Sequence, residues 1–436
     1  MEKRKMGKER IYFRSPNINV CFKAGIAGNF SEDDFRRAID MAAERHPLVN
    51  CVIRIDEKGD AWYLPGRSKA SLEFFEDANP MAWRKWYEKM DNIPFDFENG
   101  PIVKIGVFRN GDSADMVILG HHVIGDGIGY FNLLKDILLG LDGKPNTVPP
   151  ILPERIAFRE KAGMVFLSGY FAKKLNRMWQ KTAKSFSHED FIQFFKVYRR
   201  GNPPGMYLGE IEGSKTVEVL GACRKHGITV NEAIASALTA ALQKEVECYS
   251  SKQVRLGCAA NIRGELEIAA PDCMGNFVSG ISVKAYYDNG KSFVENAKVI
   301  GSSLRKKLGN PKSRHLVINF VDMLDEDFIE SVFFAVYGNY DNNVSKKLGE
   351  ILGERTCDKG LGISNLGKQN MNGHDNIVVS NIVFVPPAFP ANIVNLGVIT
   401  TNNHMSFCLR YSEADIDGKT VERVYREMIG LLCRTA

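Results

Sequence analysis

The chain has 436 residues, 44% of them hydrophobic and 25% charged, which is the composition of a globular protein long enough for two lobes with separate cores. Its net charge of +5 is too small for this length to predict nucleic-acid binding, although it suits an acidic or phosphorylated ligand. No charge-free apolar run approaches the ~20 residues that a membrane-spanning helix needs.

Residues 1–150 predict one α/β lobe. Ser31 is placed to cap a helix, and a strand is expected over residues 48–55. A second helix is expected to begin at Pro80, and another strand over residues 101–108. The alternation of helices and strands in this part of the chain predicts a sheet covered by helices.

The most informative segment reads His121-His122-Val123-Ile124-Gly125-Asp126-Gly127. An apolar strand over residues 116–119 precedes it, and apolar residues at helical spacing follow it up to Gly140. A histidine with its ordinary pKa of ~6.5 accepts and returns a proton near neutral pH, and a fixed loop between two packed elements aims its ring. The pattern therefore predicts a catalytic loop.

Other interpretations of this loop have to be weighed. Adjacent histidines are often a hydrogen-bonded polar pair at a strand end, without any chemistry. A metal site made by His121, His122 and Asp126 is disfavoured, because neighbouring side chains on an extended strand point to opposite faces. A nucleotide-binding loop over residues 125–129 is disfavoured, because it lacks the lysine and the glycine spacing of a phosphate-binding loop. We therefore expect no metal.

Residues 151–205 are predicted to form a basic connector, with prolines at both ends and many Lys and Arg residues between them. Part of it, residues 164–179, has the pattern of a basic amphipathic helix. This pattern favours a solvated linker helix. A peripheral contact with a membrane surface is the second interpretation.

Residues 206–436 predict a second α/β lobe. Thr229 and Glu232 form a capping box for one of its helices, and Asn402-Asn403 is typical of a tight hairpin turn. A terminal amphipathic helix closes the chain. Strands are expected over residues 254–261, 277–285, 377–385 and 396–411.

The nine cysteines are scattered and include no Cys-x-x-Cys pair. The basic first ten residues are not followed by the apolar segment and cleavage site of a secretion signal. We therefore expect reduced thiols and a cytoplasmic protein.

Six short motifs occur in an order that resembles one superfamily. They are found at residues 45–48, 94–101, 121–127, 261–266, 274–278 and 364–367. The resemblance as a whole extends from about residue 11 to about residue 412 and leaves out most of the basic connector. The loop at residues 121–127 looks like the His-His-x-x-x-Asp-Gly motif of the condensation-domain and chloramphenicol-acetyltransferase-like acyltransferases. Within them, the chain resembles the free-standing alcohol acetyltransferase type.

The resemblance implies a V-shaped molecule of two chloramphenicol-acetyltransferase-like lobes, each a mixed sheet with helices, and an active site in a channel at their junction. It implies that His122 is the catalytic residue and that Asp126 pairs with Arg263 and holds the loop. His121 and Gly127 would support the same loop. Three further residues are implied as oxyanion donors or as lining of the channel: Ser364, Asn365 and Asn276.

The implied reaction moves an acyl group from a thioester directly to a hydroxyl or amine acceptor, with His122 as general base and no permanently bound cofactor. Acyl-CoA is the expected donor. An alternative is a condensation enzyme that takes its acyl group from a carrier protein in trans. A non-catalytic interaction module of the same fold is a third possibility, and the intact histidine loop argues against it.

Overall fold

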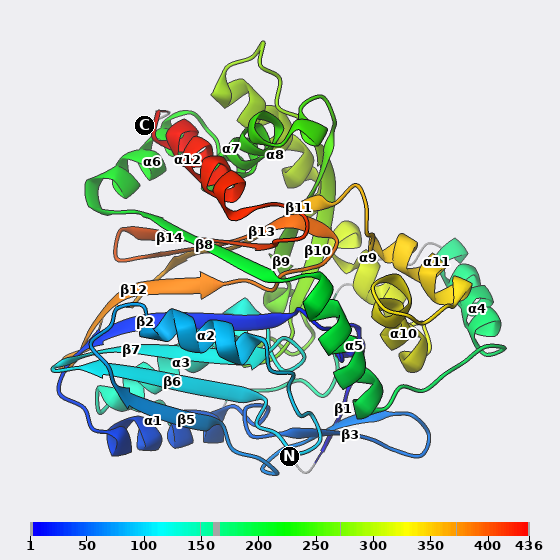
Figure 1. The fold of residues 1–436 in the computed structure, drawn as a ribbon, viewed down its shortest axis with the longest axis horizontal. Helices are drawn as coiled ribbons and strands as arrows, with labels where there is room; N and C mark the ends of the chain where they lie inside the picture. Colours follow the sequence, from blue (N-terminus) through cyan, green and yellow to red (C-terminus); the bar gives the residue numbers. More distant parts are fainter. Residues whose placement is uncertain (1–2, 149, 160–165, 271, 372, 435–436) are drawn as a thin grey trace.

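The computed structural model describes residues 3–148, 150–159, 166–270, 272–371 and 373–434, and it shows a two-lobed α/β molecule with one large sheet in each lobe (Figure 1). Both large sheets contain parallel and antiparallel neighbours, as the predicted fold class requires. Two large core clusters accompany them, one in each lobe. None of the helices in the described ranges has the length and apolarity needed to cross a bilayer.

The sheet of the N-terminal lobe has five strands. In spatial order they are β12 (Val378–Val385), β2 (Asn19–Ala27), β7 (Ser113–His121), β6 (Val103–Asn110) and β5 (Ser71–Glu76). The first of these comes from the other half of the sequence, and it pairs antiparallel with β2. Residues 378–385 therefore lie in the N-terminal lobe's sheet, although they belong to the range predicted for the second lobe.

Helices cover this sheet on both faces. The helices α1 (Glu32–Arg45) and α3 (Gly127–Leu141) pack against each other, and α3 contacts β2, while α2 (Ala82–Asp91) contacts β6 and β7. Because both faces are covered, the central residues of β7 are an unbroken apolar run without exposed surface. Ser31 caps the start of α1 as predicted, and the structure adds the reciprocal hydrogen bond from Asp34 that completes a capping box.

A smaller sheet lies beside the first lobe. It contains β1 (Arg4–Lys5), β4 (Ala61–Leu64) and β3 (Val52–Ile55), in that order. The strand predicted over residues 48–55 therefore begins four residues late. The reason is a turn after Pro47, in which the amide of Val49 donates to the carbonyl of His46 at 2.9 Å.

The sheet of the C-terminal lobe has six strands. In spatial order they are β10 (Val278–Ala285), β9 (Val254–Asn261), β11 (Gly360–Gln369), β13 (Asn392–Thr401), β14 (His404–Ser412) and β8 (Pro204–Ile211). The predicted hairpin turn is confirmed, since Asn402 and Asn403 adopt left-handed φ values of 49° and 59° between β13 and β14.

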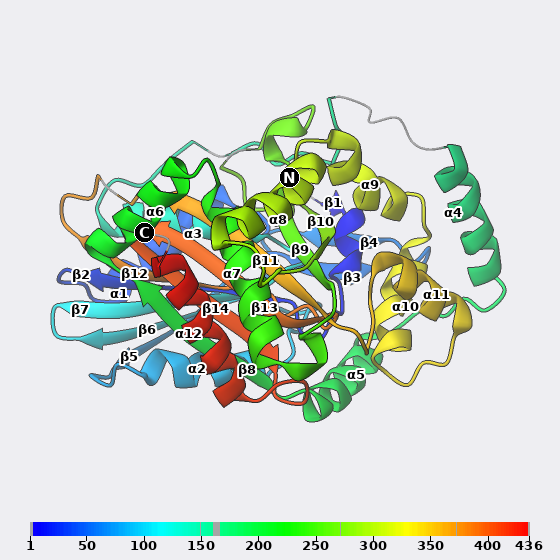
Figure 2. The same cartoon turned by 90° about the horizontal axis from the view of Figure 1, so that it is seen from above.

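Four helices accompany this second sheet. They are α6 (Gly213–Lys225), α7 (Val230–Glu245), α8 (Phe293–Leu308) and α12 (Gly418–Arg434). Seen from above, α12 and α7 lie across the strands β8, β13 and β14 (Figure 2). The capping box of Thr229 and Glu232 is confirmed at the start of α7.

The segment predicted as a connector contains two packed helices, α4 (Phe166–Trp179) and α5 (His188–Gly201). The buried residues of α4 are Ala172, Leu175 and Trp179, and the indole of Trp179 stacks on Phe328 at 5.1 Å between ring centroids. The expectation of a solvated linker helix is therefore wrong. Three helices that the sequence pattern did not predict help to cover α4: α9 (Pro311–Val321), α10 (Glu326–Val336) and α11 (Asn343–Leu352).

Candidate active site

The histidine loop lies between the end of β7 and the start of α3, so residues 122–126 connect two packed elements. Two buried phenols hold its backbone. The hydroxyl of Tyr130 donates to the carbonyl of His121 at 2.9 Å, and the hydroxyl of Tyr63 donates to the carbonyl of Val123 at 2.7 Å. These two hydrogen bonds hold the backbone directly before and directly after His122.

His121 is the inward-pointing histidine. Its ring lies edge-on to Phe97, with 4.9 Å between the centroids. Its Nδ1 accepts from the amide of Val123 at 3.2 Å, which leaves the proton on Nε2, facing the carbonyl of Ser15 at 3.4 Å. Burial lowers the pKa of His121 to about 3, so this ring stays neutral and acts as a spacer in the core.

His122 points to the seam between the two halves of the chain. Its ring stacks on Tyr12, with 4.4 Å between the centroids and 27° between the planes, and it lies 6.4 Å from the ring of Phe389. The side chain is buried, at 5% exposure, and its Nδ1 has no hydrogen-bond partner among the described residues. Burial lowers the pKa of His122, and the carboxylate of Asp126 opposes this shift.

Asp126 and Arg263 form the main polar link between the loop and the second lobe. The guanidinium nitrogens Nη1 and Nη2 of Arg263 each donate to one carboxylate oxygen of Asp126 at 2.8 Å. The same oxygens also accept from the amides of Gly129 at 2.9 Å and Phe277 at 2.8 Å. Burial alone would raise the pKa of Asp126, but the charge of Arg263 and these donors hold it below its usual value.

Arg263 is well placed for this pairing because it lies in the short helix η3 (Arg263–Glu265), which follows β9 directly. Asp126 in turn caps the N-terminus of α3 with its side chain. A single carboxylate therefore begins one helix of the first lobe and holds the end of a strand of the second. The structure thus brings together the two residues that the sequence motif predicts as partners.

Two further predicted residues, Asn276 and Gly127, lie at the histidine loop. The amide Nδ2 of Asn276 donates to the carbonyl oxygen of His122, whereas the Oδ1 of Asn276 is buried without a partner among the described residues. A Cβ atom on Gly127 would lie 3.1 Å from both Leu366 and Phe384, so glycine here lets two segments of the second half approach the loop.

Ser364 and Asn365 lie on β11, and no described contact joins either of them to His122. The Oδ1 of Asn365 instead accepts from the amide of Gly367 at 2.8 Å. Their role as oxyanion donors therefore stays a prediction, and so does that of Asn276, whose side-chain amide donates to the carbonyl of His122 while the residue lines the cavity described next.

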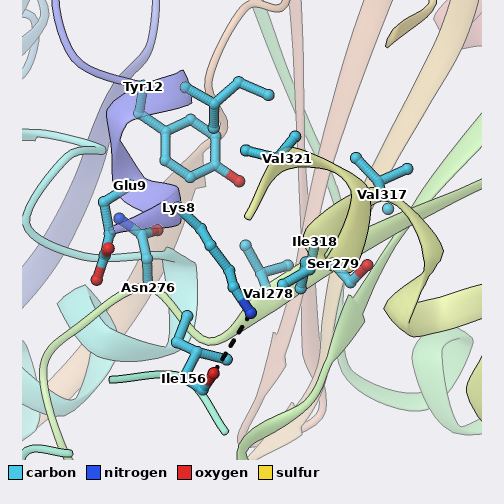
Figure 3. Close-up of a pocket in the computed structure, with 12 residues that line it drawn as sticks. Lys8, Glu9, Tyr12, Ile156, Asn276, Val278, Ser279, Val317, Ile318 and Val321 are labelled. Atoms are coloured by element: carbon cyan, nitrogen blue, oxygen red, sulfur yellow. Dashed lines mark hydrogen bonds between the residues drawn. The ribbon is translucent and has the colours of Figure 1, made fainter. Parts of the chain in front are cut away.

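A small cavity of about 70 Å³ lies next to His122, and its lining includes Tyr12, Asn276 and Lys8 (Figure 3). The apolar wall is made by Val317, Ile318 and Val321 of α9. His122 is not among the lining residues, because the phenol of Tyr12 stacks on its ring and faces the cavity itself. Tyr12 therefore lies between the imidazole and this cavity, a feature that the expected open channel does not include.

The side chains of His121 and Asp126 are already engaged in hydrogen bonds, which argues against the alternative of a metal bound by these two residues and His122. Both oxygens of Asp126 accept hydrogen bonds, and the Nδ1 of His121 does so as well. Within the described ranges, the side chains that gather at metal-ligand distances are those of Glu210, Glu212 and His404, on the surface of the second lobe.

Tyr12 and Phe389 are the contacts of His122 that sequence reasoning missed. Tyr12 follows the short helix η1 (Lys8–Ile11), and Phe389 lies between β12 and β13, so each is far from the loop in sequence. Neither residue belongs to a motif that points to the loop. Their position depends on tertiary packing, which a pattern of residue types along the chain does not report.

Comparisons with known proteins identify the family. The family model described as Condensation domain matches residues 10–310. The hybrid PKS-NRPS synthetase traA of Penicillium crustosum is 26% identical over 164 residues, which are 35% of this chain and 4% of that protein. Bacitracin synthase 3 of Bacillus licheniformis is 25% identical over 119 residues, 26% of this chain and 2% of that protein. The chain therefore spans only a small part of the length of these relatives.

Solved structures share the fold over the whole chain. The trichothecene 15-O-acetyltransferase TRI3 of Fusarium sporotrichioides superposes with a TM-score of 0.68 at 11% identity, covering 100% of this chain and 96% of that one. The condensation domain of the Monacolin K polyketide synthase MokA gives a TM-score of 0.63 at 12% identity, with 100% and 97% covered. Because the matched residues 10–310 are more than half of the chain and include both Asp126 and Arg263, the chain belongs to the condensation-domain family.

Proposed function

We propose that the protein transfers an acyl group from a thioester to a hydroxyl or amine acceptor, with His122 as the general base. The observation that carries this proposal is the imidazole of His122 at the junction of the two halves, buried between Tyr12 and Phe389 and kept neutral by a lowered pKa. A neutral imidazole is the form that takes a proton, and a positioned base contributes about 10²- to 10⁴-fold to the rate.

The proposed reaction balances without a covalent enzyme intermediate. His122 takes the proton of the acceptor while the acceptor's oxygen or nitrogen forms a bond to the thioester carbonyl carbon. The tetrahedral intermediate then expels the thiolate as the carbon–sulfur bond breaks, and the imidazolium returns its proton to the sulfur. Asp126 and Arg263 act as positioning residues, because they fix the loop and do not face the reacting atoms.

The donor that we propose is an acyl-CoA. The acetyltransferase among the structural neighbours supports a small-molecule acyl transfer on this fold. The curated relatives are synthetases of the PKS-NRPS and peptide type, which supports a second candidate, a condensation reaction with a carrier-bound thioester. All nine cysteines are free, which fits the proposed cytoplasmic setting.

The test is the release of free thiol from a panel of acyl-CoAs in the presence of alcohols and amines. We expect thiol release that depends on the acceptor and that is lost in His122→Ala but kept in His226→Ala, a histidine outside the site. Turnover by His122→Ala at the wild-type rate would contradict the proposed mechanism. Turnover only with a loaded carrier protein would favour the second candidate.

A further inference from the structure

A second and larger cavity, of about 730 Å³, lies at the other end of β9 and β10 from the histidine loop. It is lined by six basic side chains: Lys252, Arg255, Lys284, Lys307, Arg355 and Lys359. Its acidic lining residue is Asp358, whose carboxylate lies 3.8 Å from Lys252. We call this cavity the basic groove.

Most of these cations have no carboxylate partner. Lys359 is paired with Asp415 at 2.6 Å, but among the described residues no carboxylate lies within 4.0 Å of Arg255, Lys284, Lys307 or Arg355. The Nη2 of Arg255 donates instead to the carbonyl of Ala391 at 2.8 Å. Burial lowers the pKa of Arg255, and the nearby charge of Arg355 lowers it further. The groove therefore gathers like charges that an anionic ligand would neutralise.

An uncovered face of the sheet connects this groove with the smaller cavity at Tyr12. Residues of β10 and β9 that face outward pair directly in the register: Val278 with Asn261, Gly280 with Ala259, Ser282 with Gly257 and Lys284 with Arg255. Gly280 lines the smaller cavity and Ser282 lines the basic groove, so the two cavities adjoin on this strand.

The side chains on this face are small. A Cβ atom on Gly280 would meet no heavy atom within 4 Å, and Gly280 and Ala259 are both exposed. An extended ligand can therefore lie close to the backbone between the basic groove and the smaller cavity. At the far end, the buried Oδ1 of Asn276 has no hydrogen-bond partner in the described part of the chain, and it is available to an amide N–H of such a ligand.

The distance between the two cavities along β10 matches the length of a pantetheine arm. Six residue steps along β10 from Val278 to Lys284 span roughly 20 Å. A pantetheine arm, with two amide groups, is about as long as five residues of extended chain, or roughly 17 Å. A phosphate at one end would then meet the cations of the groove, while the sulfur at the other end would reach the cavity beside Tyr12.

We propose that the basic groove binds the phosphates of coenzyme A and that its pantetheine arm lies along β10 toward Asn276. This inference rests on the proposed function, and it assigns a binding site to the acyl-CoA donor of that reaction. Coenzyme A carries a diphosphate and a 3′-phosphate, whereas a carrier-bound arm carries one phosphodiester. The four cations without a carboxylate partner match the larger charge.

Binding of CoA and of pantetheine, measured by titration calorimetry, tests the groove without any turnover. We expect CoA to bind at least tenfold more tightly than pantetheine, since charge-assisted contacts to phosphate are worth about a factor of ten each. The double variant Lys284→Glu/Arg355→Glu changes two exposed residues and should remove this advantage while leaving the binding of pantetheine unchanged. Lys225→Glu, an exposed lysine on α6, is the matched control.

Kinetic measurements distinguish a loss of CoA binding from a loss of the acyl-transfer step. In the double variant, KM for the acyl-CoA should rise at least tenfold relative to KM for an acyl-N-acetylcysteamine thioester, which has no phosphate. If the double variant and the wild type bind CoA equally well, the groove is not the phosphate-binding site, and the proposed acyl transfer is unaffected by that result. Tight CoA binding without any acyl transfer would support the groove and contradict the proposed function. Binding only of a phosphopantetheine-loaded carrier protein would overturn the assignment to CoA.

Discussion

The strand pair β9–β10 has a charged cluster at each end, and the two clusters differ in whether their cations are paired with carboxylates. At the end next to the histidine loop, Arg263 makes two hydrogen bonds to the buried Asp126, and both charges are neutralised within the protein. At the other end, Arg255 and Lys284 are paired in the register, and no carboxylate of the described residues lies within 4.0 Å of either cation. The paired end fixes the relative position of the two halves, and the unpaired end keeps its charge for a ligand. The predictions below test how far this contrast holds.

The largest expected effect is on catalysis at the paired end. His122→Ala should lower kcat/KM by about 10²- to 10⁴-fold, because the general base is lost. The melting temperature should change little, since the Nδ1 of this ring has no described partner to lose. Thiol release and thermal unfolding measure the two quantities on the same samples, and a large loss of stability would show that His122 belongs to the fixed scaffold.

The largest expected effect on stability is at Asp126. Asp126→Ala leaves Arg263 buried without its partner, which should cost about 3–5 kcal/mol of unfolding free energy. Chemical denaturation measures this cost. The control is Asp341→Ala, because its carboxylate is 89% exposed and its ion pair with Lys346 lies in solvent. If Asp126→Ala is as stable as this control, the ion pair does not hold the halves together.

A smaller effect is expected at Tyr12, which separates His122 from the cavity. Tyr12→Ala should speed the modification of His122 by diethyl pyrocarbonate on the order of tenfold, since the stacked ring that covers the imidazole is removed. Tyr12→Phe keeps the ring and should behave like the wild type. Peptide mapping by mass spectrometry follows the modification. An equal rate in all three proteins would mean that Tyr12 does not control access.

The smallest effect is a dependence of stability on pH. Burial lowers the pKa of His121 to about 3, so between this pH and about 6.5 the unfolded chain binds a proton that the folded chain does not. Stability should therefore be complete above about pH 6.5 and should decline as the pH is lowered from there toward 3. Denaturation at a series of pH values measures the slope. His121→Gln should reduce it, and an unchanged slope would contradict the burial of a neutral ring.

Sequence patterns predict the local parts of this molecule well. The helix cap at Ser31, the capping box at Thr229 and the hairpin at Asn402-Asn403 follow from short-range hydrogen bonding, and all three are found. The pairing of Asp126 with Arg263 follows from a family motif, and the structure places the two side chains in contact. These features depend on few residues with specific chemistry.

The missed features depend on long-range packing. The helices α9, α10 and α11 cover α4, so an amphipathic pattern that suits a solvated helix is buried instead. The stacking of Tyr12 on His122 joins residues that are far apart in sequence. The basic groove likewise collects residues from separate strands and loops, and the small net charge of +5 gives no indication of it.

The strand β12 has a mechanical consequence. It leaves the second half of the chain, adds to the edge of the first lobe's sheet beside β2, and then returns to β13. A wide hinge motion would have to break the backbone ladder between β12 and β2, a costly event compared with a side-chain rotation. We therefore expect admission to His122 to be governed by rotamer changes of Tyr12 rather than by the two lobes swinging apart.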